Sequence, residues 1–133
     1  MARSRRSDLP DFGAFHVTAR GVDGCAIQRD DLDRRRFIRF LRLATKTSGW
    51  RLLAYCLMTN HFHLIVLCER EQMSRGMHAL NFRHAQAFNT RHARRGHLFQ
   101  ERFHARVIRD DEHLLAACAY VADNPVRAGL CAE

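Results

Sequence analysis

Hydrophobic and polar residues alternate with a period of two near the start of the chain. In the stretch GAFHVTAR (13–20), the apolar positions are Phe15, Val17 and Ala19, and the polar positions are His16, Thr18 and Arg20. This alternation predicts a β-strand with one buried face, because successive side chains of a strand point to opposite sides. The turn-forming residues GVDG (21–24) end the strand.

The pattern then changes to helical spacing. Apolar residues recur three or four positions apart, which predicts a helix that ends at Gly49. Asp30 or Asp31 is a suitable N-cap. The apolar stripe of this helix consists of Phe37, Phe40, Leu41 and Ala44.

Two apolar runs follow, at 50–58 and 61–68, with only Thr59 and Asn60 between them. Strands joined by two residues predict a tight antiparallel hairpin. A second helix is expected over 74–94, with a stripe of Met73, Met77, Leu80, Ala87 and Phe88. A fourth strand is expected over 101–108, and a last helix over 112–124, capped by Asp110 or Asp111 and ended by Pro125.

This order of elements predicts an α+β domain. It is the split β-α-β-β-α-β pattern of a ferredoxin-like antiparallel sheet, with an additional C-terminal helix. Helices cover one face of such a sheet, which leaves the other face for a ligand. Residues 1–11 are expected to form a flexible basic arm, and residues 12–133 a single domain. The fold alone does not indicate a function.

Net charge narrows the choice of partner. The chain carries +8 at neutral pH, and of its 22 basic residues only Lys46 is a lysine. The planar fork of arginine suits phosphates and base edges better than the point charge of lysine. A genome rich in arginine codons explains the ratio of arginine to lysine, but it does not explain the excess of basic over acidic residues. We therefore expect nucleic-acid binding.

Other features exclude some classes of protein. The five cysteines form no C-x-x-C pair and are odd in number, which argues against a disulfide framework and against a zinc cluster. No run approaches the roughly 20 apolar residues of a membrane span. The basic N-terminus lacks the apolar stretch of a secretion signal. We expect a cytoplasmic protein.

Two histidines interrupt the most apolar run of the chain. His61 and His63 lie two apart on a predicted strand, so they point to the same side, with Cα atoms separated by roughly 6.6 Å. Both imidazoles can then reach one cation, each at roughly 2 Å. The alternative is a pair of histidines that only make hydrogen bonds on a sheet face. Phe62 points the other way and is interpreted as core.

The last predicted helix offers partners for this pair. Tyr120 and Asn124 lie one turn apart and share a face. An asparagine carbonyl is a neutral oxygen ligand, and a tyrosine hydroxyl can attack a phosphorus atom polarised by a cation. Taken singly, Tyr120 is better explained as an ordinary interfacial aromatic, and Asn124 as a helix C-cap before Pro125.

These motifs together resemble a known family. The stretches YCLMTNHFHLIV (55–66) and AYVADNPVRAGL (119–130) are similar to the single-tyrosine HUH transposases, in particular to the IS200-like and REP-associated tyrosine transposases. Further stretches resemble the same family and occur in the same order as in its members, so the resemblance covers about residues 12 to 130. They are FHVTARG, RDDLDRRRFI, SRGMHALNFRHAQAFN and GHLFQERF.

The resemblance implies a function and roles for residues. Family members have the ferredoxin-like fold and cleave single-stranded DNA at or near hairpins, with Mg²⁺ or Mn²⁺, through a 5′-phosphotyrosine link that a free 3′-hydroxyl later resolves. By this resemblance, Tyr120 is the nucleophile, His61 and His63 are catalytic metal ligands, and Asn124 completes the metal site. Relatives usually continue past NPVRAGL, so we expect a weaker grip on the hairpin or lower specificity. A monomer and a homodimer both stay open, as do mobile and domesticated forms.

DNA contacts are expected from arginines near the first and fourth strands and the segment between the second helix and the fourth strand: Arg20, Arg94, Arg95, Arg102 and Arg106. Arg34 to Arg36 are interpreted as a solvated helix face. For His16, His97 and His104, DNA contact and simple surface exposure stay open. The rival hypotheses are a nucleic-acid-binding module that has lost catalysis and a metal sensor, which would leave the arginine excess unused.

Overall fold

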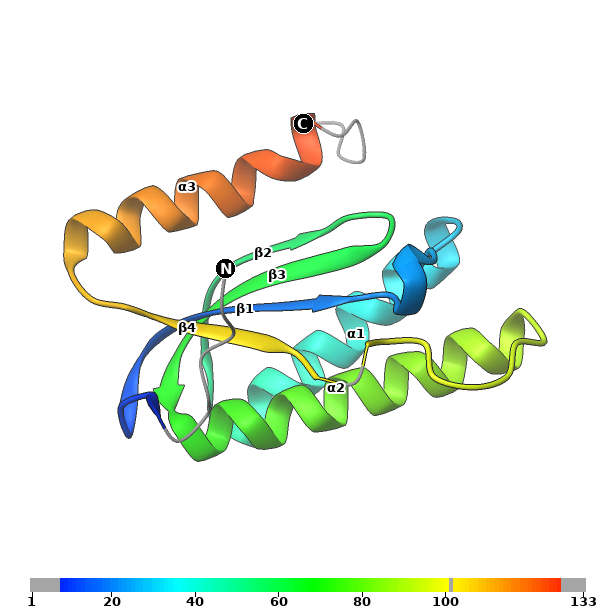
Figure 1. The fold of residues 1–133 in the computed structure, drawn as a ribbon, viewed down its shortest axis with the longest axis horizontal. Helices are drawn as coiled ribbons and strands as arrows, with labels where there is room; N and C mark the ends of the chain where they lie inside the picture. The colour runs from blue at the N-terminus through cyan, green and yellow to red at the C-terminus, as the bar shows by residue number, and fades with distance from the viewer. Residues whose placement is uncertain (1–7, 101, 128–133) are drawn as a thin grey trace.

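The computed structural model describes residues 8–100 and 102–127, except for the side chains of 122–127. The main elements follow one another along the chain as strand, helix, two strands, helix, strand and helix (Figure 1). A short 3₁₀ helix, Val22–Gly24, follows the first strand. The main elements are β1 (Phe12–Arg20), α1 (Asp31–Ser48), β2 (Arg51–Leu57), β3 (His61–Glu69), α2 (Arg70–Arg91), β4 (His104–Ile108) and α3 (Asp111–Arg127).

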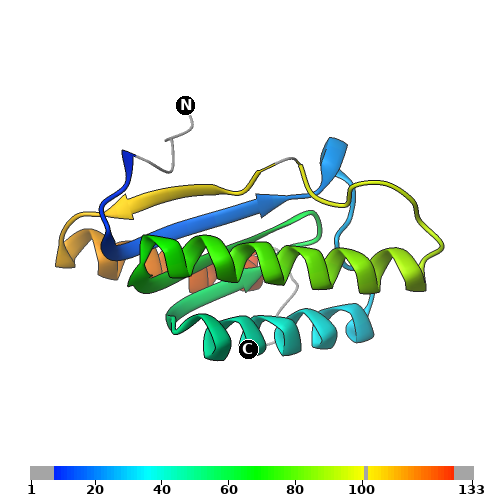
Figure 2. The ribbon, with the colours of Figure 1, turned by 90° about the horizontal axis from the view of Figure 1, so that it is seen from below.

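The four strands form one antiparallel sheet in the order β2-β3-β1-β4. Helices α1 and α2 lie side by side on one face of this sheet, and α3 crosses the opposite face (Figures 1 and 2). The expected α+β architecture is therefore confirmed, with a four-stranded antiparallel sheet and three helices. Within the described residues, no helix is long and apolar enough to span a membrane.

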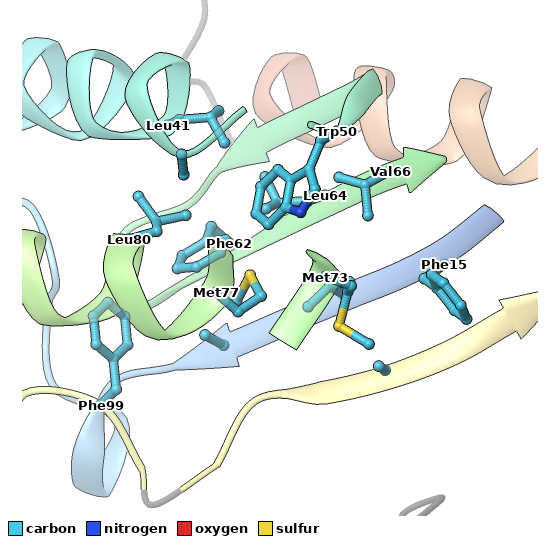
Figure 3. Close-up of a cluster of buried hydrophobic side chains, with 14 of the residues drawn as sticks. Phe15, Leu41, Trp50, Phe62, Leu64, Val66, Met73, Met77, Leu80 and Phe99 are labelled. Atoms are coloured by element: carbon cyan, nitrogen blue, oxygen red, sulfur yellow. The ribbon is translucent and has the colours of Figure 1, made fainter. Parts of the chain in front are cut away.

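The main core lies between the sheet and the α1–α2 layer (Figure 3). Phe15 and Val17 are fully buried, as the alternation in β1 predicts. Phe62 and Leu64 bury the same face of β3, so the interpretation of Phe62 as core is correct. On the other face, α3 covers a smaller cluster formed by Ala14, Cys56, Ile65, Ile108 and Val121.

Local signals explain how α1 begins and ends. The Asp30 side chain accepts a hydrogen bond from the backbone N–H of Asp33 at 3.1 Å, which makes it the N-cap. Gly49 ends the helix at φ 75°, a left-handed conformation that glycine adopts without strain. Both expected caps are therefore confirmed.

The position of the second helix differs from the expected 74–94. It begins four residues earlier, because Glu69 and Gln72 form a capping box in which the Glu69 N–H donates to the Gln72 side chain at 2.8 Å. Inside it, a Cβ on Gly76 would lie 2.2 Å from the Trp50 indole. Glycine therefore lets the tryptophan pack directly against the helix backbone.

Two further boundaries differ from the sequence-based expectations. Helix α3 continues through Pro125 to Arg127, so the expectation that the proline ends it is wrong. Strand β4 begins at His104, and Glu101 lies outside the described residues. Leu9 is buried, and its carbonyl accepts a hydrogen bond from Arg70 at 2.8 Å. Residues 1–7 of the predicted arm lie outside the described residues.

Candidate active site

The polar residues on the α3 side of the sheet come from three strands. Thr18 on β1 pairs with His63 on β3, and Arg20 pairs with His61. On the other side of β1, His16 pairs with Arg106 of β4. Directly paired residues of antiparallel strands point to the same face, so pairing gathers these polar side chains beside the apolar cluster under α3.

The two predicted histidines and the predicted tyrosine lie close together. The rings of His61 and His63 are 5.0 Å apart between centroids and nearly perpendicular, at 81°. The Tyr120 ring lies 6.3 Å from the His63 ring, also at 81°. Both histidines are half-buried, whereas Tyr120 is 49% exposed and therefore accessible to a large substrate.

A neighbouring amide orients His61. The Nδ1 atom of His61 lies 2.7 Å from the Oδ1 atom of Asn60, the last residue of the turn between β2 and β3. Because a carbonyl oxygen only accepts hydrogen bonds, Nδ1 must carry the proton and donate it. The lone pair of His61 is then on Nε2, which is the atom left to bind a cation.

His16 orients His63 in the same way. Its Nε2 atom lies 3.0 Å from the His63 Nδ1 atom, and the Thr18 hydroxyl oxygen lies 3.3 Å from the same atom. When His63 donates from Nδ1 to His16, its lone pair is on Nε2, as in His61. The sequence left His16 open between two roles, since only the strand register reveals this contact.

Burial and positive neighbours keep the three imidazoles neutral. Burial, helped by the charges of His16, His61, Arg20 and Arg106, lowers the pKa of His63 to about 4. Burial and the nearby Arg20 also lower the pKa of His61. The pKa of His16 is lowered by burial and by Arg106 and His113. Their lone pairs are therefore available at neutral pH.

The donor atoms fit a divalent cation with a partly open coordination sphere. Among the described side chains, no group of three or more His, Cys, Asp or Glu residues could hold a metal ion. The described donors are the Nε2 atoms of His61 and His63. Asn124 lies in α3 one turn after Tyr120, but its side chain is outside the described part of the chain. A cation here would complete its sphere with oxygen ligands from an amide, a phosphate or water.

Two of the five predicted DNA-binding arginines lie near the histidines. Arg20 and Arg106 are close enough for their charges to lower the pKa of His63. Arg94 is half-buried and donates hydrogen bonds to neighbouring groups of its own segment. Arg95 and Arg102 are exposed, and their role in DNA binding stays a prediction.

Fold and sequence comparison together place this protein among transposases. The model of the IS200-like transposase family matches residues 24–124, and the chain belongs to this family. The resemblance found in the sequence is thereby confirmed. No curated protein sequence matches the chain.

Two solved structures share the fold. A REP-associated tyrosine transposase bound to a REP hairpin matches with a TM-score of 0.71 and 18% identity, over 98% of this chain and 76% of that chain. A protein of Deinococcus radiodurans R1, provisionally assigned as a transposase, matches with a TM-score of 0.57 and 17% identity, over 93% of this chain and 97% of that one. At these identities, the likeness concerns the fold.

Proposed function

We propose that the protein is a tyrosine transposase of the HUH type, which cuts and rejoins single-stranded DNA at or near hairpins through a 5′-phosphotyrosine intermediate. The observation that carries the proposal is the 6.3 Å separation of the Tyr120 and His63 rings, beside a second histidine 5.0 Å from the first. Membership of the transposase family and the likeness to a hairpin-bound tyrosine transposase support it.

The fold supports the same proposal. The strand order β2-β3-β1-β4, with α1 and α2 on one face, agrees with a ferredoxin-like domain, and α3 is then the additional helix that carries the tyrosine. The contact between Tyr120 and His63 forms within one chain. The proposed site therefore does not need a second copy, and a homodimer stays a separate prediction.

Tyr120 is the proposed nucleophile. Its hydroxyl oxygen attacks the phosphorus of the DNA backbone, a Tyr–O–P bond forms, and the P–O3′ bond breaks. The hydroxyl loses its proton, and the leaving 3′-oxygen gains one to become a free hydroxyl. One phosphodiester replaces another, so the 3′-hydroxyl can reverse the reaction by attacking the phosphotyrosine without external energy.

His61 and His63 are the proposed ligands of Mg²⁺ or Mn²⁺, with Asn124 as the third. When bound, the cation would stabilise negative charge that develops on the phosphate. The hydrogen bonds that His61 donates to Asn60 and His63 donates to His16 hold the two imidazoles in the tautomer that binds through Nε2. Imidazole pairs favour Mn²⁺ over Mg²⁺ by ligand softness.

Arg20 and Arg106 are proposed to bind the phosphates that flank the cleaved bond. Both charges lie close to His63, where a DNA backbone in contact with Tyr120 would pass. Guanidinium groups pair well with phosphate oxygens and position the strand without reading its sequence.

A single substitution tests the chemistry. A hairpin oligonucleotide with a single-stranded flank, incubated with Mn²⁺, is expected to give a protein–DNA adduct that survives denaturation. Tyr120→Phe should abolish the adduct because the nucleophilic oxygen is gone, while oligonucleotide binding is retained. Tyr55→Phe removes the other tyrosine of the chain and is the matched control.

Two results would contradict the proposal. An adduct that survives Tyr120→Phe would show that another residue attacks the phosphate. The absence of any adduct with the unmodified protein, despite tight binding, would favour the second candidate, a nucleic-acid-binding module on the same fold without catalysis. The excess of arginine supports that candidate equally, but it does not account for the grouping of Tyr120 with the histidines.

A further inference from the structure

A basic groove lies between α1 and α2, on the face of the sheet opposite to Tyr120. Its volume is about 520 Å³. Figure 2 shows the two helices that form its walls running side by side. We call it the arginine groove, because four arginines line it around a partly apolar floor: Arg36, Arg39, Arg83 and Arg91, with Phe40 and Ala87.

Three of these arginines have no carboxylate partner in the part of the chain that the structure describes. Of the described residues, no carboxylate lies within ion-pair distance of Arg36, Arg39 or Arg83. The nearby Asp30 and Asp33 both bind Arg91 instead. Like charges gathered in one groove repel each other, so an anionic ligand would stabilise this surface.

The shape and composition of the groove indicate the kind of anion. Guanidinium forks from two helices can bind several phosphate oxygens at once, which an extended polyanion supplies. Phe40 is half-buried in the floor and offers an apolar surface for sugars or bases. A backbone of linked phosphates with apolar groups between them matches both features.

The groove runs along α1 and α2. The start of α1 and the end of α2 lie at the same end of the molecule as His61. The Ile27 N–H, shortly before α1, donates to the Thr59 carbonyl of the β2–β3 turn at 2.8 Å. Arg91, near the end of α2, binds Asp30 at the start of α1. A nucleic-acid strand that passes around this end would contact the helix layer on one side and the face with the histidines on the other.

We propose that the arginine groove binds the phosphodiester backbone of a nucleic acid, as a second contact surface apart from the histidine–tyrosine site. The sequence pattern is interpreted as a solvated helix face at residues 34–36; Arg36 is half-buried and lines the groove. The bound segment is either the single strand that flanks the cleaved bond or a duplex stem. Both present the same phosphates.

Neutralising one groove arginine from each helix tests the proposal. Arg39→Gln/Arg83→Gln removes two charges from the groove, and Arg42→Gln/Arg75→Gln removes two exposed charges outside it, one from each helix. The full chain is titrated into a labelled single strand, a blunt duplex and a tailed hairpin, with EDTA to prevent cleavage, over a series of salt concentrations. Thermal unfolding checks that both variants are folded.

The groove variant is expected to bind at least one probe about 10-fold more weakly than the control variant. The slope of log Kd against log salt should fall by about 1.5, since each lost phosphate contact contributes roughly 0.7 to 0.9. Weaker binding to the single strand would identify the flanking single strand as the segment that occupies the groove. Weaker binding to the duplex would identify the hairpin stem. Equal binding by the two variants to all three probes would overturn the proposal.

The adduct assay separates this proposal from the proposed function. If the unmodified protein forms no adduct but the groove variant still loses affinity, the groove proposal stands and the catalytic one falls. If the adduct forms but both double variants bind alike, the catalytic proposal stands and the groove proposal falls.

Discussion

The two nitrogen atoms of His63 have different surroundings. Nδ1 faces His16 and Thr18 of the neighbouring strand, at 3.0 and 3.3 Å. This leaves Nε2 as the atom that can bind a ligand. A tautomer set by a neighbouring hydrogen bond is a common feature of histidines that bind metals, and it determines how well they do so.

At the residue scale, His16 should therefore affect cation affinity without touching the cation. His16→Phe removes the acceptor for His63 and is expected to weaken Mn²⁺ binding by about 10-fold or more. His16→Gln retains an acceptor and should weaken it less. Electron paramagnetic resonance of free Mn²⁺ measures both dissociation constants independently of DNA cleavage. His78→Phe, an exposed histidine of α2, is the control; unchanged affinity in His16→Phe would contradict this role.

The lowered pKa values also make a prediction about pH. Two histidines with ordinary pKa values near 6.5 would lose Mn²⁺ affinity by about 70-fold between pH 7 and pH 5.5, because protons compete for both nitrogens. Here the pKa of His63 is about 4, so few protons bind to His63 at pH 5.5, and the pKa of His61 is also lowered. The measured loss should be far smaller. A loss of the full size would show that the histidines are not protected from protonation.

At the scale of elements, an ionic cluster joins the start of α1 to the end of α2. Asp33 is 2% exposed and accepts hydrogen bonds from Arg91 and His92, both at 2.8 Å. Burial alone would raise the pKa of Asp33, but the hydrogen bonds from these two residues and from the Arg29 N–H outweigh it and lower the pKa. The ionised carboxylate therefore stabilises the helix pair.

Asp33→Asn should reduce the free energy of unfolding at pH 7 by about 2 kcal/mol, less than for a fully buried pair because Arg91 is partly exposed. The folded-state pKa lies below the unfolded one, so this stabilisation is present above about pH 4 and is lost as pH falls through the folded-state value. Urea unfolding at a series of pH values from 7 downward into acid measures it, and the difference between the two proteins should shrink as the pH falls. Asp31→Asn, at an exposed pair, is the control and should change little.

The apolar patterns of the elements predict most of what they bury, but not where each element ends. The stripe of α2 correctly predicts that Met73, Met77, Leu80 and Phe88 are buried. Its true start depends on Glu69 and Gln72, two polar residues whose mutual hydrogen bonds outweigh the missing apolar repeat. His84 is buried in the same helix, where its Nε2 atom lies 2.7 Å from the Ile27 carbonyl. A single-sequence pattern does not identify such a partner.

At the scale of the whole molecule, the two faces of the sheet are unequally packed. The cluster under α1 and α2 contains most of the large buried side chains, whereas the cluster under α3 has five small or medium ones. Elements with fewer buried apolar contacts open at lower free energy. The helix that carries Tyr120 is therefore the more weakly held layer.

Hydrogen exchange measures this difference. Amide protons of α3 should exchange about 10-fold or more faster than those of β1 and β3. Val121→Ala, which trims a fully buried side chain of the α3 cluster, should speed α3 further and leave α2 nearly unchanged. Equal protection of α3 and the central strands would show that the tyrosine helix is held as firmly as the core.

Patterns along the chain were enough to predict the kinds of elements, their order, the buried faces of β1 and β3, and the resemblance that singled out Tyr120, His61 and His63. These follow from local periodicity and contiguous motifs, which the chain carries in its linear order. The folded structure was needed to show that His16 faces His63, that Arg20 and Arg106 lie beside them, and that Arg36, Arg39 and Arg83 line one groove. Such contacts depend on strand register and helix packing, which many distant residues set together and which no local pattern encodes.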